Sequence, residues 1–181
     1  EPVREMIFEA APETLKLNLL SLFFSLLIAV PVGVLAAVKR YSPFDYLSMV
    51  GATLGIALPN YWVGLMLIIV FSLKLGWLPP YGSDSWKSFV LPVSVLASQE
   101  MAILARLSRG TTSEVLSQDY VTTARAKGLR DRVVISRHVV RNALLPVVTM
   151  VGYRIAFILS GTIVVETIFA WPGLGQLFFN S

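Results

Sequence analysis

A basic segment between two apolar stretches holds the residues best suited to bind charged groups. Residues 120–146 read YVTTARAKGLRDRVVISRHVVRNALLP and include one acid, Asp131. Guanidinium and ammonium groups bind phosphates and carboxylates. Six such groups occur here: Arg125, Lys127, Arg130, Arg132, Arg137 and Arg141. The pattern predicts contact with an anionic surface, which could belong to nucleic acid, to lipid or to a partner protein.

Catalytic chemistry has no comparable signal in the sequence. The 181 residues contain no cysteine and one histidine, His138. The phosphate-binding pattern G-x-x-x-x-G-K-[ST], the zinc pattern H-E-x-x-H and the nucleophile pattern G-x-S-x-G do not occur. We therefore expect no catalytic residue, no metal and no cofactor in this chain. Any energy-linked work would need a partner that supplies the energy.

Local signals in the basic segment predict two helices joined by a corner. Thr111 and Glu114 have the spacing of a capping box, which predicts a helix start there. Gly128 suits the left-handed end of that helix, and Asp131 suits the cap of the next one. The first helix should present one face made of Val115, Leu116, Tyr120 and either Thr123 or Ala124. The second should present Val133, Val134, Val140, Ala143 and Leu144.

The elements that must position this segment are those of a membrane protein. Hydrophobic residues make up 55% of the chain, charged residues 14%, and the mean hydropathy is +0.70. Crossing the hydrocarbon core takes roughly 20 apolar residues. Four runs are near or above that length, at about 14–38, 46–73, 89–107 and 143–167. Because lipid cannot pair backbone polar groups, we expect an all-α protein with about four transmembrane helices. We expect kinks at Pro31, Pro59, Pro92 and Pro146.

The distribution of Lys and Arg predicts the orientation of the spans. The loops after the first and third runs lie on the same side of the membrane. Together with their edges they contain ten of the fifteen cations: Lys39, Arg40, Arg106, Arg109, Arg125, Lys127, Arg130, Arg132, Arg137 and Arg141. Cationic loops face the cytoplasm, so residues 39–45 and 108–142 should be cytoplasmic. Four aromatic residues, Trp77, Tyr81, Trp86 and Trp171, fall on the opposite side and would form an interfacial belt.

The small residues at 122–128, TTARAKG, favour one of the three anionic surfaces. Integral membrane proteins rarely bind nucleic acid. Anionic lipid would accept a basic amphipathic helix and accounts for some of the arginines. Alanine and glycine also let another protein approach closely, which favours a docking element for a cytoplasmic partner.

The motifs and their order resemble a known family of membrane transport proteins. QDYVTTARAKGL, RHVVRNALLPVVT and VVETIFAWPGLGQL resemble the EAA loop region of binding-protein-dependent ABC importer permeases. ATLGIALPNYWVGLMLIIVFSLKLGWLPPYG also resembles that family, in particular the B-type subunits that import dipeptides, oligopeptides or nickel. Two departures from the general EAA pattern are Thr122 at the glutamate position and a longer distance from Gly128 to Pro146. Both are expected of the peptide and nickel branch.

The resemblance implies a type I importer fold and a set of partners. These are a second homologous permease, two ABC ATPase subunits and an extracytoplasmic solute-binding protein, in the cytoplasmic (inner) membrane of a prokaryote. Residues 120–129 would form a coupling helix in a groove of an ATPase subunit, whose closure would rock the spans. The contact residues would be Tyr120, Thr122, Thr123, Ala124, Arg125, Ala126, Lys127, Gly128, Arg130 and Arg132. ATP hydrolysis would belong to the partner, and the cargo would be peptides, or nickel or another small solute.

Polar groups inside the spans are candidates for a translocation path. Ionisable residues within membrane helices usually mark function. Glu100 and Arg154 would either pair with each other or line a water-filled path. Asn60, directly after Pro59, would either cap the restarted helix or face the path. Glu166 would lie near the outer mouth and contact the binding protein. The small residues of GATLG, 51–55, would allow close helix packing within the chain or within a dimer.

The resemblance also bears on domain organisation and on the competing functions. We interpret residues 1–181 as one permease domain, with its coupling loop at 108–142. A first span, an extracytoplasmic insert and a last span are expected outside it. The alternatives are an ion-gradient-driven secondary transporter or channel, and a purely structural membrane subunit. Neither of them needs TTARAKG followed by a helix into RNALLP.

Overall fold

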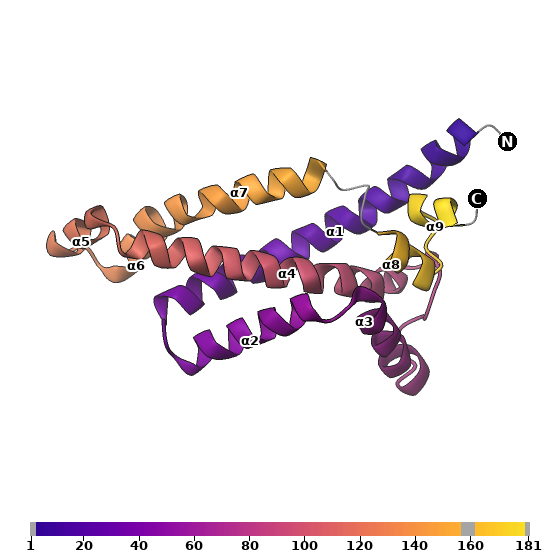
Figure 1. Cartoon of the computed structure of the whole chain (residues 1–181), viewed down its shortest axis with the longest axis horizontal. Coiled ribbons are helices and arrows are strands. Elements are labelled where there is room, and N and C mark those ends of the chain that lie inside the picture. Colours follow the sequence, from indigo (N-terminus) through magenta and orange to yellow (C-terminus); the bar gives the residue numbers. More distant parts are fainter. Residues whose placement is uncertain (1–2, 157–161, 180–181) are drawn as a thin grey trace. The chain divides into compact units, whose positions relative to one another are not determined.

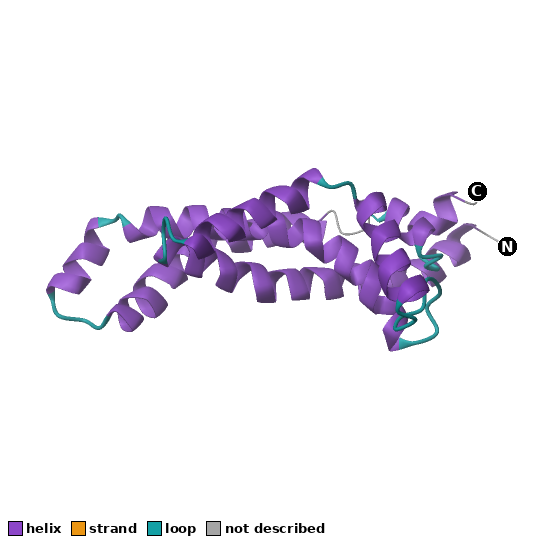
Figure 2. Ribbon diagram, turned by 90° about the horizontal axis from the view of Figure 1, so that it is seen from below, coloured by secondary structure: helices purple, strands orange, loops and turns teal. Residues whose placement is uncertain are grey.

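The structure is a computed structural model that describes residues 3–156 and 162–179. Within these ranges every regular element is a helix, and short loops join them (Figure 1, Figure 2). The α-helices are α1 (Val3–Val38), α2 (Pro43–Ala57), α3 (Asn60–Leu67), α4 (Trp86–Leu116), α5 (Asp119–Ala126), α6 (Asp131–Val133), α7 (Val140–Ala156), α8 (Ile163–Ile168) and α9 (Leu174–Phe179). Two π-helical segments, η1 (Ile68–Lys74) and η2 (Val134–Val139), continue α3 and α6. The predicted all-α class is confirmed.

Three helical segments are long and apolar enough to cross a membrane: Arg4–Val38, Trp86–Leu116 and Asp131–Ala156. A fourth span is possible if Pro43–Ala57 and Asn60–Lys74 count as one, although they meet at an angle of 102°. Pro59 lies in the break between them and has no backbone N–H to continue the helical ladder. The predicted second span is therefore broken at Pro59 rather than gently kinked.

The apolar run predicted at 143–167 is the later part of a longer helical segment, and the predicted helix from the glycine corner into the membrane is confirmed. The helix begins at Asp131, well before the predicted residue 143, and α7 ends at Ala156. Hydropathy missed its start because the first turns carry Arg132, Arg137 and His138, whose charge or polarity hides a continuous helix. Within the rest of the run, α8 is a separate short helix, and residues 157–161 lie outside the described residues.

The described residues form two compact units. Unit 1 comprises residues 1–25, 56–100 and 157–181 without the undescribed positions, so α1 and α4 contribute to both units. Its apolar core consists of Leu17, Leu91, Val93, Val95, Leu96, Val165, Phe169 and Trp171. Trp171 is fully buried, and its ring lies edge-on to Phe89 with centroids 4.4 Å apart. The predicted interfacial position of Trp171 is therefore wrong, whereas Trp77, Tyr81 and Trp86 are exposed.

Unit 2 comprises residues 26–55 and 101–156. Its core is built from apolar residues on α1, α4 and α7, namely Ala29, Leu104, Ala105 and Val147. At Gly33, α1 and α4 approach so closely that a Cβ atom added to Gly33 would lie 2.6 Å from the Ala105 carbonyl oxygen. The Ser108 hydroxyl donates a hydrogen bond to the Val30 carbonyl across the same contact, at 3.3 Å. Gly33 thus sets the spacing of α1 and α4 in this unit.

In the predicted close-packing motif at 51–55, Ala52 is buried within the chain, but Gly51 is not in a close contact. Gly51 is exposed, and among the described residues no atom lies within 4 Å of a Cβ built there. Sequence spacing identifies a small-residue pattern but not which neighbour it faces. A contact of Gly51 with another protein stays a prediction.

We expect Gly33→Ala to destabilise the protein and Gly110→Ala to be neutral or slightly stabilising. At Gly33 the new methyl group would force α1 and α4 apart, and overpacking of this kind costs about 1–3 kcal/mol. Gly110 is on α4, is exposed and has no described atom within 4 Å of its Cβ position. Thermal unfolding of the full-length purified protein should show a lower Tm for Gly33→Ala alone. Equal Tm values for the two variants would contradict the close contact.

Candidate functional site

The basic segment folds as a helical corner after the end of α4 (Figure 1). α4 ends at Leu116 and α5 begins at Asp119, so the predicted four-turn helix is divided at residues 117–118. Thr111 does not cap a helix. It lies within α4, where its hydroxyl donates to the carbonyls of Leu107 and Ser108. A threonine three residues before a glutamate suits a helix interior too, because the hydroxyl can bond backward along its own helix.

Gly128 ends α5 as predicted, with φ +79°. The Gly128 N–H donates to the Arg125 carbonyl at 2.9 Å, and the Leu129 N–H donates to the Ala124 carbonyl at 3.4 Å. This pair of bonds is the Schellman motif, in which the residue after the cap is left-handed. The motif satisfies the last carbonyls of α5 and turns the chain back toward α6.

Asp131 does not cap the next helix. The N-cap of α6 is Arg130, and no side chain caps it. Instead Asp131 lies in the first turn, where its negative charge suits the helix end. Its carboxylate accepts a hydrogen bond from Arg125 Nε at 3.1 Å, across the corner. Both side chains are well exposed, so this ion pair contributes little to stability.

A small buried apolar cluster packs the two sides of the corner, α5 and η2, against each other. Val121 and Ala124 of α5 pack with Val134 and Val139 of η2, and all four are buried. Val115 and Leu116, at the end of α4, pack against this cluster. The predicted faces are confirmed at Ala124, Val134 and Ala143, which are buried. They differ at one position each, where Val121 rather than Tyr120 and Val139 rather than Val140 is buried. The break after Leu116 and the wider π-helical turn of η2 change the phase that a regular α-helix would have.

The outward face of the corner carries most of the predicted contact residues. Tyr120 is exposed, and its hydroxyl accepts a hydrogen bond from Asn142 Nδ2 at 2.9 Å. Ala124 is buried within the chain's own apolar cluster, 7% exposed, so its side chain faces inward. The remaining predicted residues are exposed: Thr122, Thr123, Arg125, Ala126, Lys127, Gly128, Arg130 and Arg132.

An ion pair between a buried carboxylate, Asp45, and a half-buried guanidinium, Arg109, joins the start of α2 to α4 in unit 2. Arg109 Nε and Nη2 donate to the two carboxylate oxygens of Asp45, at 2.5 and 2.8 Å. Asp45 is 2% exposed. The Tyr41 N–H also donates to Asp45, at 3.0 Å. Three donors therefore surround one carboxylate, and two of them come from a residue 64 positions away.

Sequence reasoning missed this pair, although one local signal was present. Ser42, Pro43 and Asp45 occupy the N-cap, first and third positions of α2. The Ser42 hydroxyl accepts from the Asp45 N–H at 3.3 Å, as in a capping box. That signal predicts the start of α2 and places Asp45 at the end of a loop. Its partner Arg109 has no local signal and was counted only as one of the cytoplasmic cations.

The second buried acid, Glu166, lies in unit 1 and accepts four hydrogen bonds. Oε1 accepts from the hydroxyls of Thr14 at 2.8 Å and Thr162 at 2.7 Å. Oε2 accepts from the N–H groups of Gly175 at 2.6 Å and Gln176 at 3.3 Å. The side chain is fully buried. Its carboxylate is therefore fully used inside the chain, and a contact of Glu166 with a binding protein stays a prediction.

The hydrogen bonds around Glu166 hold the segment WPGLG, residues 171–175, against α1. Thr14 also accepts a hydrogen bond from the Leu174 N–H at 2.9 Å, and Trp171 Nε1 donates to the Glu13 carbonyl at 3.3 Å. At Gly173 a Cβ would lie 2.5 Å from Thr14 Oγ1, and at Gly175 it would lie 2.8 Å from Glu166 Oε2. The two glycines let the backbone reach the carboxylate, which neither could do with a side chain.

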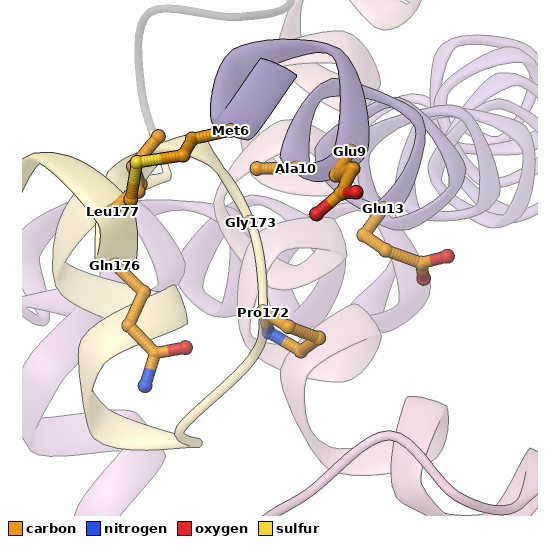
Figure 3. Close-up of a pocket in the computed structure, with 8 residues that line it drawn as sticks. All are labelled: Met6, Glu9, Ala10, Glu13, Pro172, Gly173, Gln176 and Leu177. Carbon is orange, nitrogen blue, oxygen red and sulfur yellow. The ribbon is translucent and has the colours of Figure 1, made fainter. Parts of the chain in front are cut away.

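A pocket of about 340 Å³ borders this contact (Figure 3). It lies between the first turns of α1 and the segment that leads into α9. Glu13, on its wall, forms an ion pair with Lys16 at 2.6 Å. The lining residues are Met6, Glu9, Ala10, Glu13, Pro172, Gly173, Gln176 and Leu177. The pocket is thus the outer boundary of the contact that Glu166 organises.

The other predicted path residues are only partly buried. Asn60 begins α3, and its Nδ2 donates to Gln99 Oε1 of α4 at 3.0 Å. Asn60 makes no side-chain cap; Pro59 is the N-cap of α3. Glu100 lies in α4 and Arg154 in the last turn of α7, and both are half-buried. Their pairing, and their place along a path, stay predictions.

The fold and these sites define a helical membrane protein of a transport family. Residues 29–181 match the family described as "Binding-protein-dependent transport system inner membrane component". The chain belongs to this family.

Two crystal structures share the type I importer permease fold. An amino acid ABC transporter with histidines has a TM-score of 0.72 at 17% identity, over 97% of this chain and 77% of that one. The MetNI methionine ABC transporter, inward facing, has a TM-score of 0.70 at 20% identity, over 99% and 82%.

Two curated relatives are similar in sequence over nearly all of the chain. The oligopeptide transport system permease protein AppB of Bacillus subtilis is 44% identical over 190 residues, covering 99% of this chain and 60% of the relative. The glutathione transport system permease protein GsiC of Escherichia coli K12 is 44% identical over 180 residues, covering 99% and 59%. The chain therefore spans about three fifths of the length of these relatives.

We expect Thr14→Val to loosen the Glu166 contact. Valine keeps the shape of threonine but removes both the hydroxyl donor to Glu166 and the acceptor for the Leu174 N–H. A buried polar group left unpaired costs about 1–3 kcal/mol. Hydrogen exchange of the peptide covering 172–177 in the full-length protein should become faster.

Thr53→Val is the matched control, because Thr53 is exposed and its hydroxyl bonds only to the Met49 carbonyl of its own helix among the described groups. Unchanged exchange at 172–177 in Thr14→Val would show that Thr14 does not hold the segment.

Proposed function

We propose that the chain is part of a permease subunit of an ATP-driven importer in the cytoplasmic membrane of a prokaryote. Its partners are a second homologous permease, two ABC ATPase subunits and an extracytoplasmic binding protein. The family membership and the importer permease fold support this function. ATP is hydrolysed in the ATPase subunits, and the permease provides the path and the mechanical connection.

The observation that carries the proposal is the arrangement of the α5 corner. A short helix with exposed Thr122, Thr123 and Ala126 presents small side chains, and exposed Arg125 and Lys127 surround them with positive charge. The apolar cluster beneath holds this helix against the end of α4. A protruding helix that is small at its centre, basic at its edge and firmly supported suits insertion into a groove of another protein. Residues 108–142 thus form the coupling loop and, with 39–45, face the cytoplasm.

Peptides are the substrate class that the sequence relatives favour. Their printed names specify oligopeptides and glutathione, which is itself a small peptide. Nickel or another small solute is the alternative within the branch. Asn60, Glu100 and Arg154 are proposed to lie along the path, where polar groups in a membrane protein face water or each other. An ion-gradient-driven transporter or channel is the competing class, and its activity would not require an ATPase subunit.

We expect charge reversal at Arg125 and Lys127 to weaken binding of the ATPase subunits by at least about tenfold, because unfavourable charge juxtaposition across an interface costs several kcal/mol. The double variant Arg125→Glu/Lys127→Glu puts negative charge at the edge of α5. Affinity for purified ATPase subunits is measured with the full-length permease in nanodiscs.

The control Arg137→Glu/Arg141→Glu changes the net charge equally at exposed positions outside α5. If the basic residues served only lipid contact, both double variants would bind the ATPase subunits alike. Absence of binding by the wild type would refute the proposed function itself.

Arg154→Met tests the path. Methionine preserves much of the side-chain length while removing the charge. If Arg154 lines the path, uptake of labelled glutathione or tetraalanine by the assembled transporter should fall about tenfold while the ATPase subunits still bind. Unchanged uptake together with unchanged stimulation of ATP hydrolysis would remove Arg154 from the path.

A further inference from the structure

We infer that the Asp45–Arg109 ion pair is the joint through which the coupling loop moves α2. This inference rests on the proposed function, since it concerns how movement of α5 reaches the membrane helices. Both residues act by positioning other elements, and neither is assigned a contact with cargo or with a partner. The argument uses residues of unit 2 only.

α2 is attached to the rest of unit 2 through few buried residues. All fifteen residues of α2 are described, and only Asp45 and Ala52 are buried. Most of its other apolar side chains are exposed, Tyr46, Leu47, Val50 and Leu54 among them, at 55–73% of their area, whereas Met49 is half-buried. An exposed apolar face can slide along lipid or another protein. A buried ionic contact with fixed geometry cannot, so the position of α2 follows from Asp45.

Arg109 connects this attachment to the coupling loop along one continuous helix. Arg109 precedes Leu116, the last residue of α4, by seven positions, which is about 10 Å of helix. Val115 and Leu116 pack against the cluster that holds α5 and η2. A displacement of α5 is therefore passed to the end of α4 and from there to Arg109. The bidentate contact of Arg109 passes it on to Asp45.

The neighbouring contacts make α1 part of the same rigid group. The Ser108 hydroxyl bonds to the Val30 carbonyl, and the backbone of Arg109 lies 2.9 Å from the Cβ position of Gly33. The Tyr41 N–H, in the turn after α1, donates to the same carboxylate as Arg109. The Asp45 carboxylate thus joins α2 to α4 and to the turn between α1 and α2.

The chemistry of the pair suits a joint better than a source of stability. A buried ion pair loses hydration energy that its attraction barely restores, so apolar residues would often be as stable there. Two parallel N–H to oxygen bonds, however, fix the direction as well as the distance between their partners. Removal of one partner leaves a buried charge behind and frees α2 from α4.

The experiment measures distances within the assembled full-length transporter by pulsed electron resonance. Spin labels are attached to cysteines introduced at Val50 on α2 and Asp119 on α5, which are both exposed and lie outside the proposed ATPase contact; the 181 residues contain no native cysteine. Distances are compared without nucleotide and after trapping with ADP and vanadate, so no cargo is required. In the wild type we expect one narrow distance that is the same in both states, because α2 and α5 move together.

In Arg109→Met we expect the trapped state to show a shifted or broadened distance, since α5 then moves without α2. Arg109→Lys keeps the charge but not the paired bonds, and should give an intermediate result. Exchange of the two residues, Asp45→Arg with Arg109→Asp, should restore a narrow distance that neither single reversal gives. Transport is measured for the same variants. In Arg109→Met, glutathione or tetraalanine uptake per ATP hydrolysed should fall about 5- to 150-fold without loss of basal hydrolysis.

Two results would overturn the joint. One is a wild-type distance that changes on trapping, which would mean that α2 does not follow the coupling loop. The other is an Arg109→Met variant with the wild-type distance in both states. If Arg109→Met does not assemble, Arg109→Lys decides by the same criterion. Co-purification of wild-type permease with the ATPase subunits is checked first, because its failure refutes the proposed function rather than the joint.

Discussion

A carboxylate buried in an apolar helical chain must find its donors inside the protein, and this requirement organises both units. Asp45 and Glu166 are the two acids among the described residues that are buried. Asp45 is satisfied by the guanidinium of Arg109 and one backbone N–H, and Glu166 by two hydroxyls and two backbone N–H groups. Because an unsatisfied buried charge is so unfavourable, each acid fixes the segments that supply its donors. Helices that would otherwise present only apolar surface thereby acquire defined neighbours.

The two acids use different donors, with different mechanical results. Glu166 is held by short groups at four points, and Gly173 and Gly175 leave no room for a side chain between them and the carboxylate. Such a contact binds a chain segment rigidly to α1. Asp45 is held by the end of a long arginine side chain, which reaches from one helix to another. That contact fixes the relative direction of two helices while each helix keeps its own packing. Glu166 therefore anchors a segment, whereas Asp45 couples the movement of helices.

Local sequence patterns predicted local structure, and they failed where structure depends on distant residues. Hydropathy identified the spans, and the corner at Gly128 followed from the need for positive φ. The starts and buried faces of helices were predicted less accurately. Thr111 bonds within its own helix instead of capping one, and a π-helical turn changes the phase of η2. The Asp45–Arg109 and Thr14–Glu166 contacts join residues 64 and 152 positions apart. Periodicity carries no information about such pairs, although the capping signal at Ser42 and Asp45 was available. The order of the motifs indicated the family more clearly than any single spacing.

The separation between Thr14 and Glu166 has a consequence for how the protein is made. Ribosomes add about 5–20 residues per second, so Glu166 is synthesised roughly 8–30 s after Thr14, given the 152 positions between them. During that interval the first helix enters the bilayer without its final partner. A threonine hydroxyl can then bond to a carbonyl one turn earlier in its own helix. The exchange of that temporary bond for Glu166 would make completion of the Thr14–Glu166 contact one of the last steps in the biogenesis of this segment.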